Sequence, residues 1–249
     1  MIELRQVTGG YGPVPVLKGI DLTIPRGSIT TLAGPNGCGK TTLLKIAARL
    51  LKPSGGQVLL DGKPVADYGR KEFARMVAVM PQARNVPAIT VEGLAMHGRF
   101  PYLGLSRKPG AEDHEKVQEA LEAVGVWNLR GRDLRGLSGG ERQKAYIAMA
   151  VAQDTDVIFL DEPTTYLDMG KQFELLELVQ KLNQSGKTIV MVLHDLAHSL
   201  RFSQRIVVME RGRIAAAGQP EEIFDAGILE RVFDVRGHRD GENYYFTHW

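Results

Sequence analysis

The sequence predicts an α/β fold, and three observations support this prediction. Short apolar segments typical of buried strands alternate with amphipathic segments typical of helices, as in a parallel sheet covered by helices. The first thirty residues instead alternate apolar and polar positions around glycine-rich turns, which indicates an antiparallel β subdomain. Third, a helical stretch at 83–152 interrupts the alternation of strands and helices. We expect one domain of residues 1–249, with a β subdomain and α/β core at 1–82 and 153–218, a helical insertion at 83–152 and a tail at 219–249.

The elements of the first half follow from the apolar pattern and the turn residues. Strands are predicted at 2–8, 14–24, 28–33, 55–62 and 77–80, each bounded by glycine or proline. Helical spacing predicts helices at 40–51, stopped by Pro53, and at 70–76.

The second half begins with helices and then returns to strands. Thr90 is a suitable N-cap for a helix at 91–98, and Gly125 closes a charged amphipathic helix at 111–125. Ser138 precedes a further helix. Fully apolar strands at 157–160 and 188–193 alternate with helices at 171–183 and 195–203, and two short strands follow at 205–209 and 213–217.

Composition excludes several classes of protein. The 31 basic and 29 acidic residues nearly balance, which is not the charge of a dedicated nucleic-acid binder, so no nucleic-acid partner is expected. The single cysteine excludes an internal disulfide. The first residues do not resemble a signal peptide, and no apolar run approaches the ~20 residues of a membrane span. Any membrane role is therefore expected to come through another polypeptide.

The segment between the third strand and its helix has the spacing G-x-x-x-x-G-K-T of a phosphate-binding loop. Glycines leave backbone N–H groups free to surround a phosphate, and the helix dipole adds to the positive field. Lys40 is expected to reach the β- and γ-phosphates, and the Thr41 hydroxyl to bind Mg²⁺. The loop comprises Gly34, Pro35, Asn36, Gly37, Cys38, Gly39, Lys40 and Thr41.

Polar residues follow the other apolar strands. Because charge cannot lie inside strands buried on both faces, ligands meet parallel strands at their carboxyl edge. We expect Asp161 to orient Mg²⁺, Glu162 to align the attacking water as a base, Gln82 to bond that water or the metal, and His194 to donate to the γ-phosphate. Taken singly, the glutamine is an ordinary loop amide and the histidine a surface or capping residue; only the combination with the phosphate loop indicates an ATPase.

A second motif lies at residues 137–143. Ser138 and Glu141 have capping-box spacing, and Gly139 and Gly140 leave the first-turn N–H groups of the helix uncovered. The segment is either an ordinary capped helix or a second anion site. One phosphate loop and one spare anion site together suggest a symmetric dimer, in which each spare site covers the partner's γ-phosphate.

In these motifs the chain resembles the ATP-binding subunits of ABC transporters along nearly its whole length. The resemblance implies a P-loop NTPase (RecA-like) core that binds ATP and Mg²⁺ and works as a homodimer. It assigns Walker A to 34–41 with Thr42 beside it, the Q-loop to Gln82, the signature motif to 137–143, Walker B to 157–162, the D-loop to 166–168 with Asp168, and the switch histidine to His194. Tyr11 matches the residue that stacks on adenine; a turn tyrosine without a ligand is the alternative.

Three segments, 34–40, 98–104 and 161–168, are similar to ATPases that import iron–siderophores, haem or vitamin B12. This implies a peripheral protein on the cytoplasmic face of the membrane, paired with two permease subunits and served indirectly by an extracytoplasmic substrate-binding protein. The apolar loop 100–103 is a candidate permease contact or is packed on its own helices. The cargo does not follow from the sequence.

Two other functions remain open: a soluble ABC ATPase without a transport role, such as one for cluster assembly, and an ATPase of another ABC transporter class. A kinase-like transferase is disfavoured because no acceptor-binding motif is visible. At a helix N-terminus, Cys38 is expected to have a lowered pKa, and its alkylation to block ATP binding.

Overall fold

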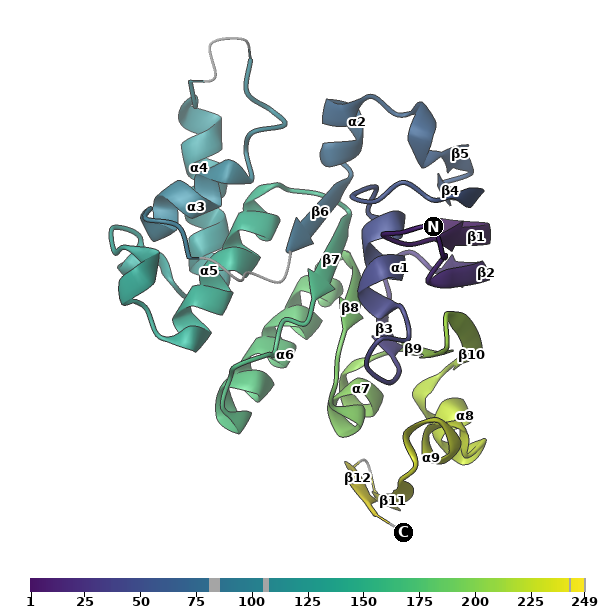
Figure 1. Ribbon diagram of the computed structural model, residues 1–249. Coiled ribbons are helices and arrows are strands. Elements are labelled where there is room, and N and C mark those ends of the chain that lie inside the picture. Colours follow the sequence, from purple (N-terminus) through teal and green to yellow (C-terminus); the bar gives the residue numbers. More distant parts are fainter. Residues whose placement is uncertain (81–85, 105–107, 242, 249) are drawn as a thin grey trace. The chain divides into compact units, whose positions relative to one another are not determined.

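The computed structural model describes residues 1–80, 86–104, 108–241 and 243–248. The chain divides into two compact units, the first formed by Met1–Tyr68 with Asn183–Trp249 and the second by Gly69–Leu182. We describe each unit by itself, with the element labels of Figure 1.

The first unit begins with the predicted antiparallel subdomain. It is a four-stranded sheet in the order β2-β1-β4-β5. Strand β1 pairs on both sides, with Ile2 opposite both Ile24 and Leu60. The apolar residues of these strands are buried at alternate positions, except where a register shift follows Leu4, and a one-residue slip would expose them. The strands are β1 (Ile2–Gly9), β2 (Leu17–Ile24), β4 (Gly55–Leu60) and β5 (Lys63–Pro64).

The same unit contains four strands in the order β10-β9-β3-β8. Strand β3 (Ile29–Ala33) runs parallel to both β8 (Thr188–Val192) and β9 (Arg205–Glu210), and β10 (Arg213–Gly218) is antiparallel to β9. Every residue of β3 and β8 is buried. Helices α1 (Lys40–Ala47) and α7 (Leu196–Phe202) pack on these strands. Helix α1 ends four residues earlier than predicted, since Arg49 adopts a left-handed conformation (φ 58°) ahead of Pro53.

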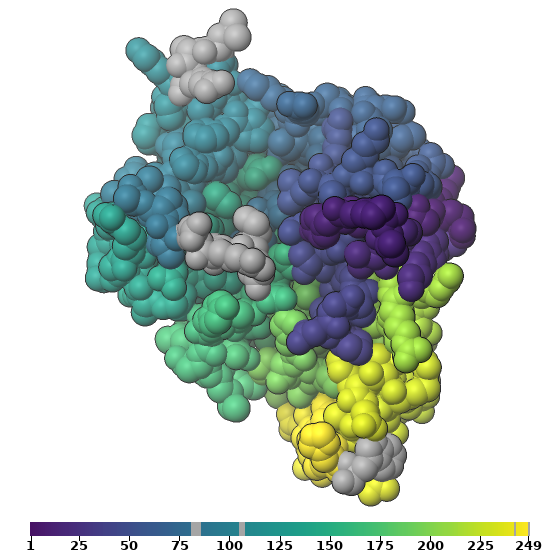
Figure 2. All heavy atoms as spheres, in the orientation of Figure 1, coloured from purple at the N-terminus to yellow at the C-terminus, as the bar shows by residue number. Residues whose placement is uncertain are grey.

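The C-terminal segment, predicted only as a tail, folds onto the first unit. Tyr244 is buried in a cluster with Leu200 and Ile206, and Arg201 donates a 2.8 Å hydrogen bond to Asn243. Figure 2 shows the yellow C-terminal residues lying against the yellow-green β10 segment. The segment consists of α8 (Pro220–Asp225), α9 (Ile228–Phe233), β11 (Arg236–Asp240) and β12 (Asn243–Thr247). Strand β11, Arg-Gly-His-Arg-Asp, has little β-propensity, which explains why the pattern did not reveal it.

The second unit joins a strand pair to a group of helices. Strands β6 (Val77–Met80) and β7 (Val157–Asp161) are parallel, with Met80 opposite Leu160. Helix α5 packs against α3, α4 and β6. The helices are α2 (Arg70–Ala74), α3 (Val91–His97), α4 (Ala111–Ala123), α5 (Gly139–Ala152) and α6 (Met169–Gln184). In the described part of the chain, no helix combines the length and the hydropathy of a membrane span.

Asp61 ties the start of the chain to the β4–β5 turn. Its carboxylate accepts hydrogen bonds from the Arg26 guanidinium and, at 2.6 Å, from the ammonium group of Met1. These bonds, first the one from Arg26, lower the pKa of Asp61 from 3.8 to about 2. Asp61 and Gly62 both have positive φ, so this is an Asp-Gly hairpin turn in which asparagine fits equally well.

We therefore predict that the protein loses stability in acid through this residue. The pKa of Asp61 is lower in the folded than in the unfolded state, so its contribution is present above pH ~4 and is lost as the pH falls towards ~2. Urea unfolding should show about 1–2 kcal/mol less loss over this range for Asp61→Asn than for the wild type, after allowance for partial exposure of the carboxylate. The same loss in both proteins would contradict the prediction; Asp67→Asn, at an exposed position nearby, is the control.

Candidate functional site

The phosphate loop connects β3 to α1 in the first unit, and its shape depends on glycine. Gly34, Gly37 and Gly39 have φ of 154°, 77° and 111°. A Cβ on Gly34 would lie 2.4 Å from the carbonyl oxygen of Met209, and one on Gly39 would lie 2.9 Å from the Leu17 side chain. The backbone thus turns in a left-handed conformation, and at Gly34 and Gly39 the surrounding chain also leaves no room for a side chain. This is the geometry that lets N–H groups approach a phosphate.

Lys40 stands at the first position of α1, and its ammonium group bends back over the loop. The Nζ atom donates to the carbonyl oxygens of Gly34 at 2.7 Å and Pro35 at 3.1 Å. The residue is only 5% exposed, so these carbonyls replace water around the charge. A cation held across a glycine loop at a helix N-terminus fits a triphosphate.

The prediction that the pKa of Cys38 is lowered is wrong. The thiol is buried, and burial raises its pKa by more than the nearby Lys40 charge and the backbone N–H groups lower it. Desolvation disfavours a thiolate even beside a cation when the sulfur packs under the loop. Cys38 is therefore a packing residue of the phosphate loop, and it is not activated.

The C-terminal ends of β3 and β8 bring His194 to the edge that carries the phosphate loop. Leu32 is the register partner of Val192, and Gly34 and His194 each follow this pair by two residues. His194 is exposed. The next residue, Asp195, caps α7 by accepting a 2.7 Å bond from the His198 N–H. The cap orients the chain immediately after His194.

Tyr11 lies in the β1–β2 connection with its ring 65% exposed. The Nζ atom of Lys45, on the outer side of α1, is 5.6 Å from the ring centroid. An exposed ring beside the phosphate-loop helix is compatible with base stacking and equally with a turn tyrosine without a ligand.

In the second unit, β7 ends in the two predicted carboxylates. Asp161 is the last residue of β7 and is 3% exposed. Glu162 has φ 54°, a left-handed conformation that is unusual for a residue with a side chain. Its carboxylate accepts a 3.2 Å hydrogen bond from the Thr165 hydroxyl. Such strain, of order 1–3 kcal/mol, persists where the surroundings over-determine a side-chain direction.

Gln82 lies outside the described residues. Its strand β6 ends at Met80 opposite Leu160, so the chain leaves β6 at the edge where Asp161 and Glu162 follow β7.

The predicted capping box is present at the start of α5. Glu141 accepts 2.8 Å hydrogen bonds from both the N–H and the hydroxyl of Ser138, and its own N–H donates to the Ser138 oxygen at 3.3 Å. The bond from the Ser138 N–H is the main cause that lowers the pKa of Glu141. Gly139 and Gly140 are partly exposed in the first turn. The motif is thus a structured helix N-terminus.

Two residues to which the sequence assigned no role connect these motifs within the second unit. The Gln143 amide on α5 donates a 2.6 Å bond to the carbonyl of Pro163, directly after Glu162. Thr165 holds the Glu162 carboxylate, as described above. In the sequence Gln143 is the last residue of the 137–143 motif. No spacing pattern predicts its bond to Pro163, which lies 20 residues away.

The D-loop follows the same strand. Asp168 accepts a 2.9 Å bond from the Lys171 N–H at the start of α6. Tyr166 has φ 66° and is 90% exposed. Its carbonyl lies 3.4 Å from the position of a Cβ on Gly139, so the D-loop and the signature motif are neighbours.

Two glycines of the phosphate loop provide a matched pair of variants. Gly34→Ala would force a Cβ against the Met209 carbonyl. The Cβ of Gly37→Ala would meet no atom within 4 Å, so this variant is destabilised only by the cost of a left-handed backbone at alanine. We expect Gly37→Ala to lower the free energy of unfolding by about 1–2 kcal/mol and Gly34→Ala to lower it further and to weaken nucleotide binding. Urea unfolding and titration with a fluorescent ATP analogue measure both quantities. Equal effects of the two variants would show that the close approach to Met209 is unimportant.

Comparison with known proteins shows the family of the chain. Residues 17–165 match the ABC transporter family. The chain is 46% identical to the probable siderophore transport system ATP-binding protein YusV of Bacillus subtilis, over 94% of this chain and 86% of the relative. It is 42% identical to the ferric enterobactin transport ATP-binding protein FepC of Escherichia coli, over 93% and 86%.

Solved structures agree with the fold. The dimeric structure of MJ0796, a bacterial ABC transporter cassette, has a TM-score of 0.77 at 30% identity and covers 88% of this chain and 99% of its own. A nucleotide-free ATP-binding cassette has a TM-score of 0.85 over 94% of this chain and 97% of its own; at 22% identity it supports the fold alone. The predicted fold class is therefore confirmed. The chain belongs to the ABC transporter family, among its ATP-binding proteins.

Proposed function

We propose that this chain is the ATP-hydrolysing subunit of an ABC importer that takes up an iron chelate of the siderophore type. The observation that carries the proposal is the similarity over nearly the whole chain to proteins named for siderophore transport, petrobactin import and ferric enterobactin transport, at 46%, 45% and 42% identity. Similarity of this extent covers the phosphate loop and the helical unit, so it is not confined to a shared nucleotide motif.

The residues of the phosphate loop fit ATP. The glycines allow the left-handed backbone of the loop, and Lys40 holds a cation over it. Residues 34–42 bind the phosphates and Tyr11 stacks on the adenine. The hydroxyl of Thr41, the amide oxygen of Gln82 and the carboxylate of Asp161 suit Mg²⁺, which prefers oxygen ligands and neutralises phosphate charge when bound.

In the proposed mechanism three polar side chains act on the γ-phosphate and on the attacking water. Glu162, held by Thr165, aligns the attacking water and accepts its proton, Gln82 orients this water, and His194 donates a hydrogen bond to the γ-phosphate. The left-handed conformation of Glu162 supports this role, because strain at a carboxylate is retained where its direction matters. In this proposal the chain is one ATPase domain, with residues 83–152 as its helical insertion and 219–249 as an added C-terminal segment.

The active form is a homodimer. Ser138, Gly139, Gly140 and Glu141 of one copy cover the γ-phosphate bound by the other, and Asp168 lies at the contact between copies. The exposed Tyr166 beside Gly139 supports an interface at this surface, since aromatic residues are enriched at protein interfaces. The related cassette MJ0796 is described as dimeric.

Two permease subunits and, indirectly, an extracytoplasmic binding protein complete the importer, with this chain on the cytoplasmic face of the membrane. Loop 98–104 contributes one suitable anchor. Leu103 is buried, and Tyr102 donates a 3.0 Å bond to the Gln153 carbonyl, whereas Phe100 is 53% exposed. Phe100 is therefore the residue of the loop that a partner helix can cover.

The proposed base gives a direct test. Glu162→Gln keeps the shape of the side chain but cannot accept the proton, so the variant should bind ATP, lose at least about 100-fold in hydrolysis rate and accumulate as an ATP-bound dimer. Size-exclusion chromatography in saturating MgATP measures the dimer. A variant that stays monomeric would contradict the proposed dimer mechanism.

The exposed loop residue tests the partner. Phe100→Ala should reduce co-purification of a multi-span permease from detergent-solubilised membranes and leave ATP binding unchanged, because truncation of an aromatic hot spot costs about 2 kcal/mol or more. Tyr245→Ala removes an aromatic ring of the same 53% exposure from β12 and is the control. If the wild-type chain is retained with cytosolic proteins and no permease, the chain is a soluble ABC ATPase instead.

A further inference from the structure

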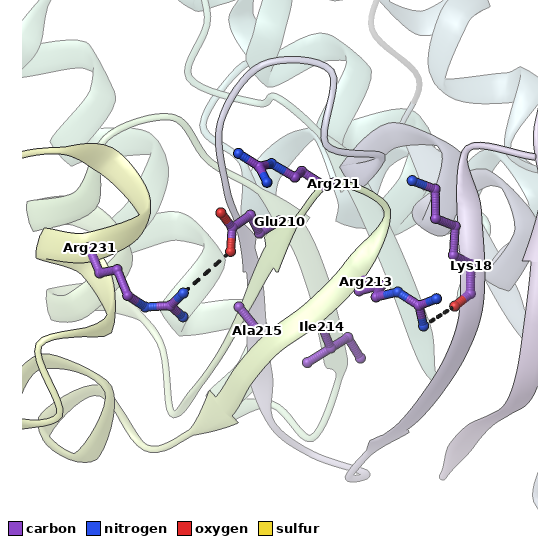
Figure 3. Close-up of a pocket in the computed structure, with 7 residues that line it drawn as sticks. All are labelled: Lys18, Glu210, Arg211, Arg213, Ile214, Ala215 and Arg231. Carbon is purple, nitrogen blue, oxygen red and sulfur yellow. Dashed lines mark hydrogen bonds and ion pairs between the residues drawn. The ribbon is translucent and has the colours of Figure 1, made fainter.

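An open cavity of about 580 Å³ lies beside the β9–β10 hairpin of the first unit, and none of the residues that line it is among those assigned above to nucleotide binding. Figure 3 shows its lining. Ile214 and Ala215 form an apolar surface in the middle, and Glu210 contributes a single carboxylate. The remaining lining residues are basic: Lys18, Arg211, Arg213 and Arg231. The lining therefore has a clear excess of positive charge.

Two of the guanidinium groups are held in place by partners on neighbouring elements. Arg213 donates a 2.9 Å hydrogen bond to the carbonyl oxygen of Lys18, and Arg231 on α9 lies 3.6 Å from the Glu210 carboxylate. Figure 3 shows these pairs at opposite ends of the lining. Anchored guanidiniums lose less rotamer entropy when they bind an anion than free ones do.

Arg211 occupies a position that is unfavourable for arginine. Glu210 and Arg213 are paired across a two-residue hairpin turn, and both central residues have positive φ, Arg211 at 49° and Gly212 at 82°. Asparagine, aspartate and glycine are preferred at the first of these positions. Another such hairpin turn of this unit follows the preference with Asp61-Gly62. A cation that lines the cavity is thus carried by a strained backbone position.

The turn that carries Arg211 is joined directly to the phosphate loop. The N–H of Gly212 donates to the Cys38 carbonyl at 3.0 Å, and its own carbonyl accepts from the Lys18 N–H at 2.9 Å. A Cβ on Gly212 would lie 1.9 Å from the Val16 carbonyl oxygen. An anion that holds Arg211 and Arg213 therefore acts on the residue between them, which contacts the loop.

We propose that this cavity binds a small, multiply charged anion with phosphate groups, and that its occupancy changes the nucleotide affinity of the phosphate loop through Gly212. Arginine forks match the oxygens of phosphate, a phosphate group carries nearly two charges, and the cavity has the size of a small-molecule site. Such groups are found on free phosphorylated metabolites and on anionic lipid headgroups. Binding of the anion is independent of the proposed function. The effect on nucleotide affinity rests on the proposed role of the phosphate loop as the ATP site.

The test uses inorganic pyrophosphate, titrated by calorimetry into the intact protein saturated with ADP, so that the phosphate loop is already filled. One further site is expected in the wild type, and Arg211→Asn should weaken it about tenfold, the scale of one charge-assisted hydrogen bond. Asparagine suits the turn, so the same variant should unfold at a higher urea concentration than the wild type. A stabilised variant that has lost the site excludes misfolding as the cause.

The exposed Arg70 of α2 supplies the matched control, since Arg70→Asn removes the same charge outside the cavity and should leave pyrophosphate binding unchanged. Absence of a second site, or equal weakening by both variants, would overturn the proposal. Sedimentation with phosphatidylglycerol vesicles identifies the source: binding that Arg211→Asn abolishes assigns a lipid headgroup, and pyrophosphate binding alone assigns a free metabolite. The coupling is overturned if pyrophosphate shifts the apparent ADP affinity equally in the wild type and in Arg211→Asn, because competition at the phosphate loop is common to both.

Discussion

The close approach of backbone to backbone around the phosphate loop is the constraint on which the first unit depends. The carbonyl of Met209 fills the place of a side chain on Gly34, and the carbonyl of Val16 does the same at Gly212. A hydrogen bond from Gly212 to Cys38 closes the contact. The loop is therefore shaped by the end of β9 and the start of β2 as much as by its own glycines. Segments that are distant in the sequence thus fix the shape of the short phosphate loop.

Burial then determines where charged groups can stand. Strands β3, β7 and β8 are buried along their whole length, so polar residues appear only where the strands end. Lys40 is buried because two loop carbonyls solvate its ammonium group. Asp161 stands at the last position of its strand, and Glu162 turns out of it with a left-handed backbone. In each unit the polar residues therefore gather where the buried strands end.

Much of the fold and of the candidate site was accessible from local patterns. The phosphate-loop spacing, the apolar strands, the Thr90 N-cap and the Ser138–Glu141 capping box depend on neighbours in the chain, and the structure contains each of them. Other features depend on distant neighbours. The pKa of Cys38 was predicted in the wrong direction because the helix N-terminus is visible in the sequence, whereas the packing that desolvates the sulfur is not. Two further features were not predicted, because they too depend on contacts between residues far apart in the sequence: the bond between Gln143 and Pro163 and the folded C-terminal segment.

The sequence by itself determined the identity of the motifs, their order and the type of most elements, because these follow from residue spacing and turn chemistry within a few positions. Only the tertiary structure decided which ends of strands share an edge, which glycines are irreplaceable and where four basic residues from separate segments surround one cavity. Lys18, Arg211, Arg213 and Arg231 are unremarkable in the sequence. The pairing of strands and the packing of α9 bring them together, because burial of apolar surface, and not any local signal, brings such distant segments into contact.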